Sequence, residues 1–249
     1  MTPAAHKPLF FIGLHEPHYA HEFERCIINI NRLERRKSDF RVNDWMLDSG
    51  AFSRLTTGRG HMELKEYVGQ IARWARCGNL VAAVSQDWMC EPFVLAKTGL
   101  TVEEHQQRTT ANYLQLRDRV QSTYVLPVLQ GYTPDEYRRH INQYGDALTT
   151  SAWVGVGSVC KRNGDPAAIL EVLRAIHSER PDLRLHGFGL KRKALENPAV
   201  NAHLTSCDSL AWSYAARRQG RSANGPTEAH RYLAVVSAMP CQLMLEKLP

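Results

Sequence analysis

The sequence predicts a (β/α)₈ barrel, in which eight parallel strands form a closed ring inside a layer of helices. Three observations favour this fold class. The chain has 249 residues, about the size of one such barrel. Short apolar runs alternate with helical patterns, as is typical of buried parallel strands in βα units. Several of these runs also end in a reactive polar residue, and the carboxyl ends of barrel strands are where active sites form.

Eight apolar runs are candidate strands. They cover residues 9–14, 26–30, 44–48, 80–86, 123–130, 152–157, 184–189 and 204–209. The second is the weakest, because residues 26–30 could equally continue a helix that begins at His21. A doubly wound open sheet would show much of the same alternation and is the alternative architecture.

The helices between these runs are marked by apolar stripes and by capping residues. Residues 64–75 carry apolar side chains at three- and four-residue steps, which predicts one buried helix face. Capping patterns predict further helix starts at Thr101, Thr133 and Asp165, the first helix reaching about Val120. We expect Pro226 to begin the last helix and Pro240 to break or kink it.

Composition indicates an ordinary globular chain, with 43% hydrophobic and 22% charged residues. No apolar run approaches the roughly 18 residues that a membrane span needs. We find no linker or composition break, so we expect a single domain over residues 1–249. The six cysteines are scattered without a C-x-x-C pair, which argues against structural zinc and a disulfide framework. The polar start argues against a secretory signal, so a reduced, cytoplasmic protein is the expectation.

Two carboxylates at predicted strand ends are the leading catalytic candidates. Asp48 ends the run Trp45-Met46-Leu47, and Asp208 ends the last predicted strand. Across a barrel mouth, such a pair suits substitution at an anomeric carbon, where one carboxylate attacks and the other moves protons. This chemistry needs no metal or cofactor, and the histidines and cysteines show no metal-ligand spacing. The alternative is that these aspartates cap helices or pair with arginines.

Other strand ends carry groups able to bind a purine. Asp87 can accept from a ring N–H and an exocyclic amine, and Gln130 can both donate and accept. The Gly155–Gly157 run could offer backbone N–H groups to a carbonyl oxygen, although a tight turn would equally explain these glycines. Phe52 could stack on a flat heterocycle or belong to the core. His186 stands at a strand end as well, where a hydrogen-bonded structural role is expected.

A basic segment follows Asp208. Arg217, Arg218 and Arg221 lie close together beside Gly220 and Gly225, and the formal net charge of +6 permits a polyanion partner. Glycine lets a backbone approach phosphate closely, so this segment is a candidate phosphate-binding loop. A solvated connection between the last strand and the last helix is the alternative.

Taken in order, these motifs resemble those of the tRNA-guanine transglycosylase family of (β/α)₈ barrels. Asp48-Ser49-Gly50-Ala51-Phe52 is similar to the family's aspartate-serine-glycine-glycine-aromatic motif, and Leu129-Gln130-Gly131 to its valine-glutamine-glycine. The other matching segments are Asp87, Arg108-Thr109, Val154 to Val159, and Cys207-Asp208-Ser209 with Arg217 and the segment 221–225. The resemblance implies that Asp208 is the nucleophile and Asp48 the general acid/base. It also implies that Ser49, Phe52, Asp87, Gln130, Gly155, Val156 and Gly157 bind the base.

Two departures qualify the resemblance. The C-x-C-x-x-C…H zinc subdomain of the tRNA enzymes has no counterpart among the 41 residues after Asp208, and Val156 stands where the family has a second glycine. Because the zinc subdomain helps to grip tRNA, its loss favours the DNA-modifying branch, the DpdA-like 7-deazaguanine DNA transglycosylases. DNA is therefore the expected partner and tRNA the less favoured one, in a bacterial or phage-infected cell.

The resemblance implies that guanine in DNA is exchanged for a 7-deazaguanine, such as 7-cyano-7-deazaguanine, through a covalent aspartyl-sugar intermediate. The alternatives are a tRNA-guanine transglycosylase, a hydrolase acting on a nucleoside or sugar, and a non-catalytic nucleic-acid-binding subunit. Retention of both Asp48 and Asp208 disfavours the last of these. Helper proteins or a homodimer are compatible with the sequence.

Overall fold

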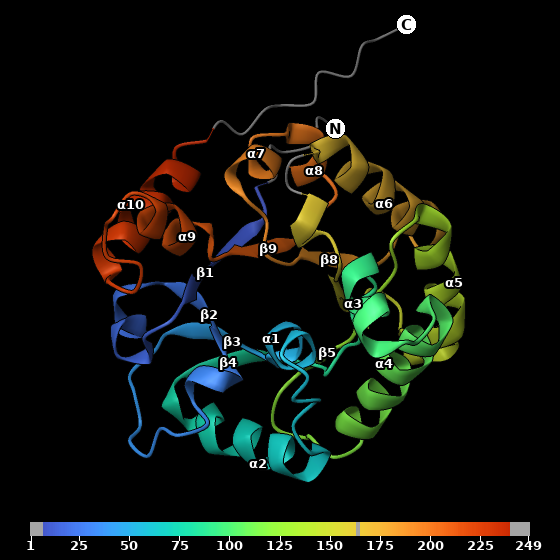
Figure 1. The fold of residues 1–249 in the computed structure, drawn as a ribbon, viewed down its shortest axis with the longest axis horizontal. Coiled ribbons are helices and arrows are strands. Elements are labelled where there is room, and N and C mark those ends of the chain that lie inside the picture. The colour runs from blue at the N-terminus through green and yellow to red at the C-terminus, as the bar shows by residue number, and fades with distance from the viewer. Residues whose placement is uncertain (1–6, 163–164, 240–249) are drawn as a thin grey trace, which may run out of the picture.

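The computed structural model describes residues 7–162 and 165–239, and its strands form one parallel sheet that curves into a barrel (Figure 1). The strands are β1 (Leu9–Leu14), β2 (Arg25–Asn29), β3 (Asp44–Asp48), β4 (Asn79–Val84), β5 (Val125–Leu126), β6 (Val128–Leu129), β7 (Trp153–Val156), β8 (Arg184–Gly187) and β9 (Ser206–Ser209). Their order around the sheet is β5-β4-β3-β2-β1-β9-β8-β7-β6. The predicted barrel is therefore confirmed.

The ring closes through the backbone on either side of Pro127. Val125 and Leu126 pair with β4, whereas Val128 and Leu129 pair with β7. Proline has no N–H for a sheet hydrogen bond, so it interrupts the strand, although its carbonyl still accepts from the backbone of β7. Counting β5 and β6 as one interrupted strand gives eight positions, and the open-sheet alternative is wrong.

Helices surround the strands (Figure 1). They are α1 (Ala51–Thr56), α2 (Leu64–Trp74), α3 (Pro92–Thr98), α4 (Val102–Arg117), α5 (Pro134–Tyr144), α6 (Pro166–Glu179), α7 (Arg192–Leu195), α8 (Pro198–Asn201), α9 (Ala211–Arg218) and α10 (Pro226–Ser237). The first two strands are followed by short 3₁₀ segments, η1 (Pro17–Glu22) and η2 (Ile30–Arg32), in place of α-helices. In the described part of the chain, every helix is too short or too polar to span a bilayer.

Most local predictions agree with this architecture. The capping boxes at Thr101 and Thr133 are both formed, and the side chain of Asp165 caps α6. The weak second strand is β2, which pairs with β1 and β3 along its length, so it does not continue a helix. The helix expected to reach about Val120 ends at Arg117. Pro240 lies outside the described residues.

The core has two layers. A large cluster fills the space between the barrel and the helices, and it includes Trp45, Tyr67 and Trp74, each at most 1% exposed. A second cluster fills the barrel interior with inward-facing strand residues, among them Phe11 and Met46. Truncating a large residue in either layer would cost about 2–5 kcal/mol. The barrel interior is therefore filled by packed side chains, and the polar residues at the strand ends lie above this packed core.

Candidate active site

The polar residues at the barrel mouth follow from the alternation of side chains along each strand. Met46 and Val128 belong to the inner core. Side chains two positions apart in an extended chain share one face, so Asp48 and Gln130 continue these inward rows at the carboxyl ends. Asp208 lies on β9, where it is only 8% exposed. Sequence-distant residues therefore meet at one end of the barrel.

Asp48 is held by donors that surround its carboxylate. The side-chain amide of Asn29 donates to Oδ2 at 2.5 Å, and the backbone N–H groups of Gly50 and Ser49 add two further hydrogen bonds. Even so, burial and, next in size, the negative charge of Asp208 raise the pKa of Asp48 to about 6. Asp48 can therefore exchange a proton near neutral pH, as a general acid/base must.

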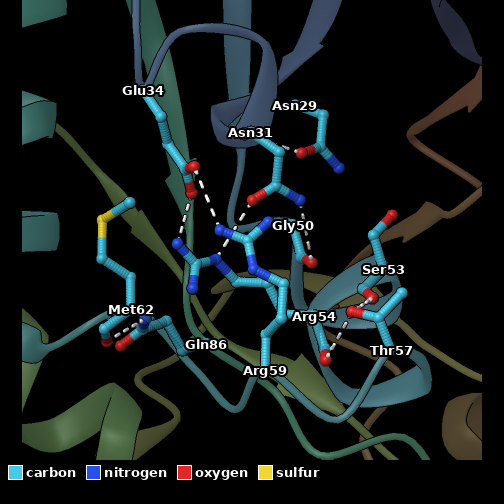
Figure 2. Close-up of polar contacts among 10 residues, drawn as sticks. All are labelled: Asn29, Asn31, Glu34, Gly50, Ser53, Arg54, Thr57, Arg59, Met62 and Gln86. Atoms are coloured by element: carbon cyan, nitrogen blue, oxygen red, sulfur yellow. Dashed lines mark hydrogen bonds and ion pairs between the residues drawn. The ribbon is translucent and has the colours of Figure 1, made fainter.

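The backbone conformation at residue 50 explains why the Asp48-Ser49-Gly50 motif has a glycine there. Its φ of 71° is the left-handed conformation, and a Cβ there would lie 2.6 Å from the side-chain nitrogen of Asn31. The sharp turn starts α1 directly after Asp48, and Asn31 also accepts from the buried guanidinium of Arg54 (Figure 2). A side chain at this position would displace the β2 loop that orients Asp48.

Asp208 is anchored through one of its two carboxylate oxygens. Oδ1 accepts from the backbone N–H of Gly189 at 3.0 Å and lies 3.3 Å from Nε2 of His186. Among the described residues, no donor contacts Oδ2 and neither Asp208 nor Asp48 forms an ion pair with lysine or arginine. The anchoring leaves Oδ2 as the oxygen available to attack a substrate.

A buried chain of hydrogen bonds fixes the protonation of His186. Trp153 Nε1 can only donate, and it lies 2.9 Å from the hydroxyl of Ser206. Among the described residues, the one acceptor that the hydroxyl's own proton can reach is His186 Nδ1, also at 2.9 Å. Nδ1 is then the acceptor, so the proton of a neutral imidazole sits on Nε2 and faces Asp208. His186 is fully buried, and it is a positioning group for Asp208 as well as a structural one.

Asp48 and Asp208 line the same cavity, of about 420 Å³. The cavity also touches Asn29, His15, Arg32 and Arg59, on the β1, β2 and α1 side of the mouth. Asp87, Gln130 and Gly157 are not among the described residues that line it. Asp48 is nevertheless close enough to Asp87 for its charge to raise the pKa of Asp87, so the cavity adjoins the residues expected to read a base.

The base-reading candidates form a buried network. Gln130, which is fully buried, donates from Nε2 to Asp87 Oδ2, and its Oε1 accepts from Ser158 at 2.7 Å. Burial and then the charge of Asp48 raise the pKa of Asp87 to about 7. Asp87 and Gln130 thus come together as expected, although they contact each other and a base would have to replace that contact.

The glycine run on β7 acts differently from expectation. The N–H groups of Gly155 and Gly157 donate to the carbonyls of Pro127 and Leu129, so neither is free to bind a carbonyl oxygen. Both glycines instead make room. A Cβ on Gly157 would lie 2.6 Å from Cδ of Gln130, and one on Gly155 would strike the ring of Phe188. Val156 lies between them and is fully buried.

The remaining candidates lie at the edge of the mouth. Phe52 is 37% exposed and meets Phe93 edge to face at 6.2 Å, so it does not belong to the core. The Ser49 hydroxyl is buried and has no hydrogen-bond partner among the described residues. A cavity of about 420 Å³ lies beside Phe93 and Tyr132.

The three arginines after Asp208 have separate environments. Arg221 forms an ion pair with Glu228 at 3.2 Å, and Arg218 lies 5.9 Å from the ring centre of Tyr214. Arg217 is close enough to His15 to lower its pKa. Of the three, Arg217 is therefore the one associated with the cavity of the two carboxylates.

Several residues of this cavity were missed from the sequence. Asn29 had a usable signal, because it lies near the end of the predicted strand 26–30, two positions after Ile27, which the structure places in the inner core. His15, Arg32 and Arg59 had none, since they lie in loops or, for Arg32, in the short η2 segment, and the direction of these segments is determined only by the fold. Among residues 7–162 and 165–239, no group of three His, Cys, Asp or Glu side chains could hold a metal ion.

A parallel βα barrel whose strand ends bring two carboxylates into one cavity has the arrangement of a barrel enzyme. The sequence matches the family described as DeoxyPurine in DNA protein A (DpdA) over residues 6–238, and the chain belongs to that family. Membership gives the chain a DNA-modifying role of the transglycosylase type, with DNA as substrate. A comparison with curated proteins gives no match.

Proposed function

We propose that the protein replaces guanine in DNA with a 7-deazaguanine, such as 7-cyano-7-deazaguanine, through a covalent aspartyl-sugar intermediate. The observation that carries this proposal is the pair formed by Asp48 and Asp208, which line one cavity and lie close enough for the charge of Asp208 to raise the pKa of Asp48. The unpaired Oδ2 of Asp208 supplies a nucleophile, and the raised pKa of Asp48 supplies an acid/base.

In the first step, Oδ2 of Asp208 attacks C1′ of the target nucleotide and the bond from C1′ to the base nitrogen breaks. Guanine takes the electron pair of that bond and a proton from Asp48. Ester formation removes the negative charge of Asp208, which is one cause of the raised pKa of Asp48. Asp48 thus becomes a stronger acid while the leaving base gains negative charge.

In the second step, the ring N–H of the incoming 7-deazaguanine gives its proton to Asp48, and the nitrogen attacks C1′. The ester bond breaks and Asp208 leaves as a carboxylate, stabilised by the donors on Oδ1. Its returning charge again raises the pKa of Asp48 and favours the proton transfer. Two inversions at C1′ retain the configuration, as in retaining glycosidases.

The base is assigned to the buried network, with Asp87 and Gln130 reading its edge and Ser49 within reach of the same mouth. Phe52 is assigned to its face, since an exposed ring beside the mouth can stack on an extruded base. The target nucleotide must leave the duplex stack, which costs a few kcal/mol and less in a single strand. Single-stranded DNA should therefore react faster.

The test measures incorporation of labelled guanine into single-stranded DNA, duplex DNA and tRNA. We expect incorporation into DNA and a covalent DNA adduct that survives denaturation. Asp208→Asn should abolish both while leaving the circular dichroism spectrum unchanged. Release of free guanine without incorporation would indicate a hydrolase instead, and uptake into tRNA alone would reject the DNA assignment.

A further inference from the structure

The cavity that Asp48 and Asp208 line also has two arginines in its wall, Arg32 and Arg59. Arg32 follows β2 and Arg59 follows α1, and both line the cavity with exposed side chains. Asp87 and Gln130 are not among the described residues that line this cavity. A nucleotide whose C1′ meets Asp208 and whose base enters the network must direct its backbone toward the remaining open side.

Arg59 belongs to a cluster with a net positive charge. Glu34 accepts from the buried Arg54 through Oε1, while its Oε2 lies 3.4 Å from Arg59 (Figure 2). Two guanidinium groups therefore share one carboxylate. A guanidinium has five N–H donors, and the contact to Glu34 engages one terminal nitrogen of Arg59. The side chain of Arg59 is 57% exposed, so its other donors remain accessible from the cavity.

Arg32 is oriented without losing its charge. It donates to Nδ1 of His15 at 2.8 Å, and Nε2 of His15 lies 2.9 Å from the hydroxyl of Ser213. Burial, followed by the charges of Arg32 and Arg217, lowers the pKa of His15 to about 4. The imidazole is therefore a neutral acceptor at physiological pH, and it holds the Arg32 guanidinium beside the cavity without opposing an anion.

Hydroxyl groups complete this wall. Ser53 and Thr57 line the same cavity and are exposed, but the Thr57 hydroxyl donates to the backbone carbonyl of Ser53 at 2.8 Å, so the Ser53 hydroxyl is the donor of the two for a phosphate. Arginine, serine and threonine side chains are typical donors to phosphate oxygens. Two guanidinium groups and a hydroxyl donor lining one cavity suit a phosphodiester better than an uncharged sugar.

We propose that Arg32 and Arg59 form a phosphate-binding site for the DNA backbone next to the target nucleotide. The proposal rests on the proposed function, because that function requires a nucleotide at Asp208. It adds further cationic contacts to that of Arg217, which lies near His15 as Arg32 does. Holding the adjoining phosphate on this side would keep the extruded sugar in place while its base is exchanged.

The experiment compares DNA binding by wild type, Arg32→Gln and Arg59→Gln over a range of salt concentrations. Neutralising one phosphate contact should reduce the slope of log Kd against log salt by about 0.7 on single strands and 0.9 on duplexes. The affinity difference from wild type should therefore shrink roughly threefold between 50 and 200 mM salt. Arg119→Gln is the matched control, because Arg119 is exposed near the amino end of β5, at the opposite end of the barrel.

Position is tested with a single-guanine oligonucleotide carrying one neutral methylphosphonate beside that guanine. Wild type should bind this oligonucleotide more weakly than the unmodified one. Arg59→Gln should bind both oligonucleotides with nearly equal affinity, because the methylphosphonate and the substitution remove the same contact. Additive losses, or slopes equal to that of Arg119→Gln, would overturn the phosphate site. Binding is measured apart from chemistry, so guanine exchange by wild type alongside unchanged slopes would reject this site and leave the proposed function standing. Reduced salt slopes in Arg32→Gln and Arg59→Gln, without guanine exchange by wild type, would support the phosphate site and reject the proposed function.

Discussion

Replacing His186 with leucine tests how the Asp208 carboxylate is held. The substitution removes the Nε2–H that faces Oδ1 of Asp208 and leaves the Gly189 N–H in place. A hydrogen bond to a charged group contributes about 1.5–3 kcal/mol. The observed separation of 3.3 Å is slightly beyond the usual range for N–H···O bonds. We therefore take the lower end, which is about tenfold in an equilibrium constant.

The direction follows from which form of Asp208 the bond stabilises. His186 stabilises the free carboxylate more than the ester, because the ester oxygen carries less negative charge. Its loss should shift the balance between free enzyme and covalent adduct toward the adduct by about tenfold. The shift is shared between a faster attack and a slower departure of Asp208. Turnover should fall through the second step.

In the assay, the enzyme reacts with a labelled oligonucleotide and the reaction is quenched at steady state. The covalent adduct is then measured on a denaturing gel, and the rate of guanine exchange is measured in parallel. His186→Gln should restore much of the wild-type ratio, because its amide can donate from near the position of Nε2. A merely structural histidine would lower adduct and turnover together in His186→Leu. That result, in a variant with a wild-type melting temperature, would refute the positioning role.

Three further predictions concern the carboxylates and the glycine run. If protonated Asp48 is the acid for guanine release, the rate of adduct formation should fall as pH rises through about 6, and Asp48→Asn should be slow and independent of pH. The folded-state pKa of Asp87, about 7, lies above its ordinary value of 3.8, so its stabilising protonation is lost as pH rises through 7. Asp87→Asn should therefore gain melting temperature over wild type between pH 4 and pH 8, and a constant difference would contradict this. Gly157→Ala should displace Gln130 and raise the KM for guanine by at least tenfold with a smaller change in the rate of adduct formation from bound DNA, measured by steady-state kinetics.

The residues at the strand ends show how much of the site can be predicted from local sequence patterns. Asp48, Gln130 and Asp208 could be placed at one barrel mouth from the sequence, because parallel strands in βα units bring all their carboxyl ends to the same side. The capping boxes of α4 and α5 were equally readable, since each depends on residues only three positions apart. Such inferences need only neighbours along the chain and the period of a strand or helix.

Other features were decided by contacts between residues far apart in the sequence. The chain from Trp153 through Ser206 to His186 joins three strands, and nothing near His186 in the sequence indicates that its proton faces Asp208. The engagement of the Gly155 and Gly157 N–H groups likewise depends on the adjoining strand. Hydrogen-bond partners of this kind are fixed by sheet register.

The sequence by itself determined the barrel and the chemical groups at its mouth, because alternating apolar runs and caps act locally. Only the tertiary structure decided which groups face one another and where the cavity opens. Arg32 and Arg59 lie 27 positions apart in connecting segments without a sequence pattern, yet both line the cavity beside the two carboxylates. Loop direction depends on packing against the finished barrel, so charge placement around the site becomes defined only when the ring has closed.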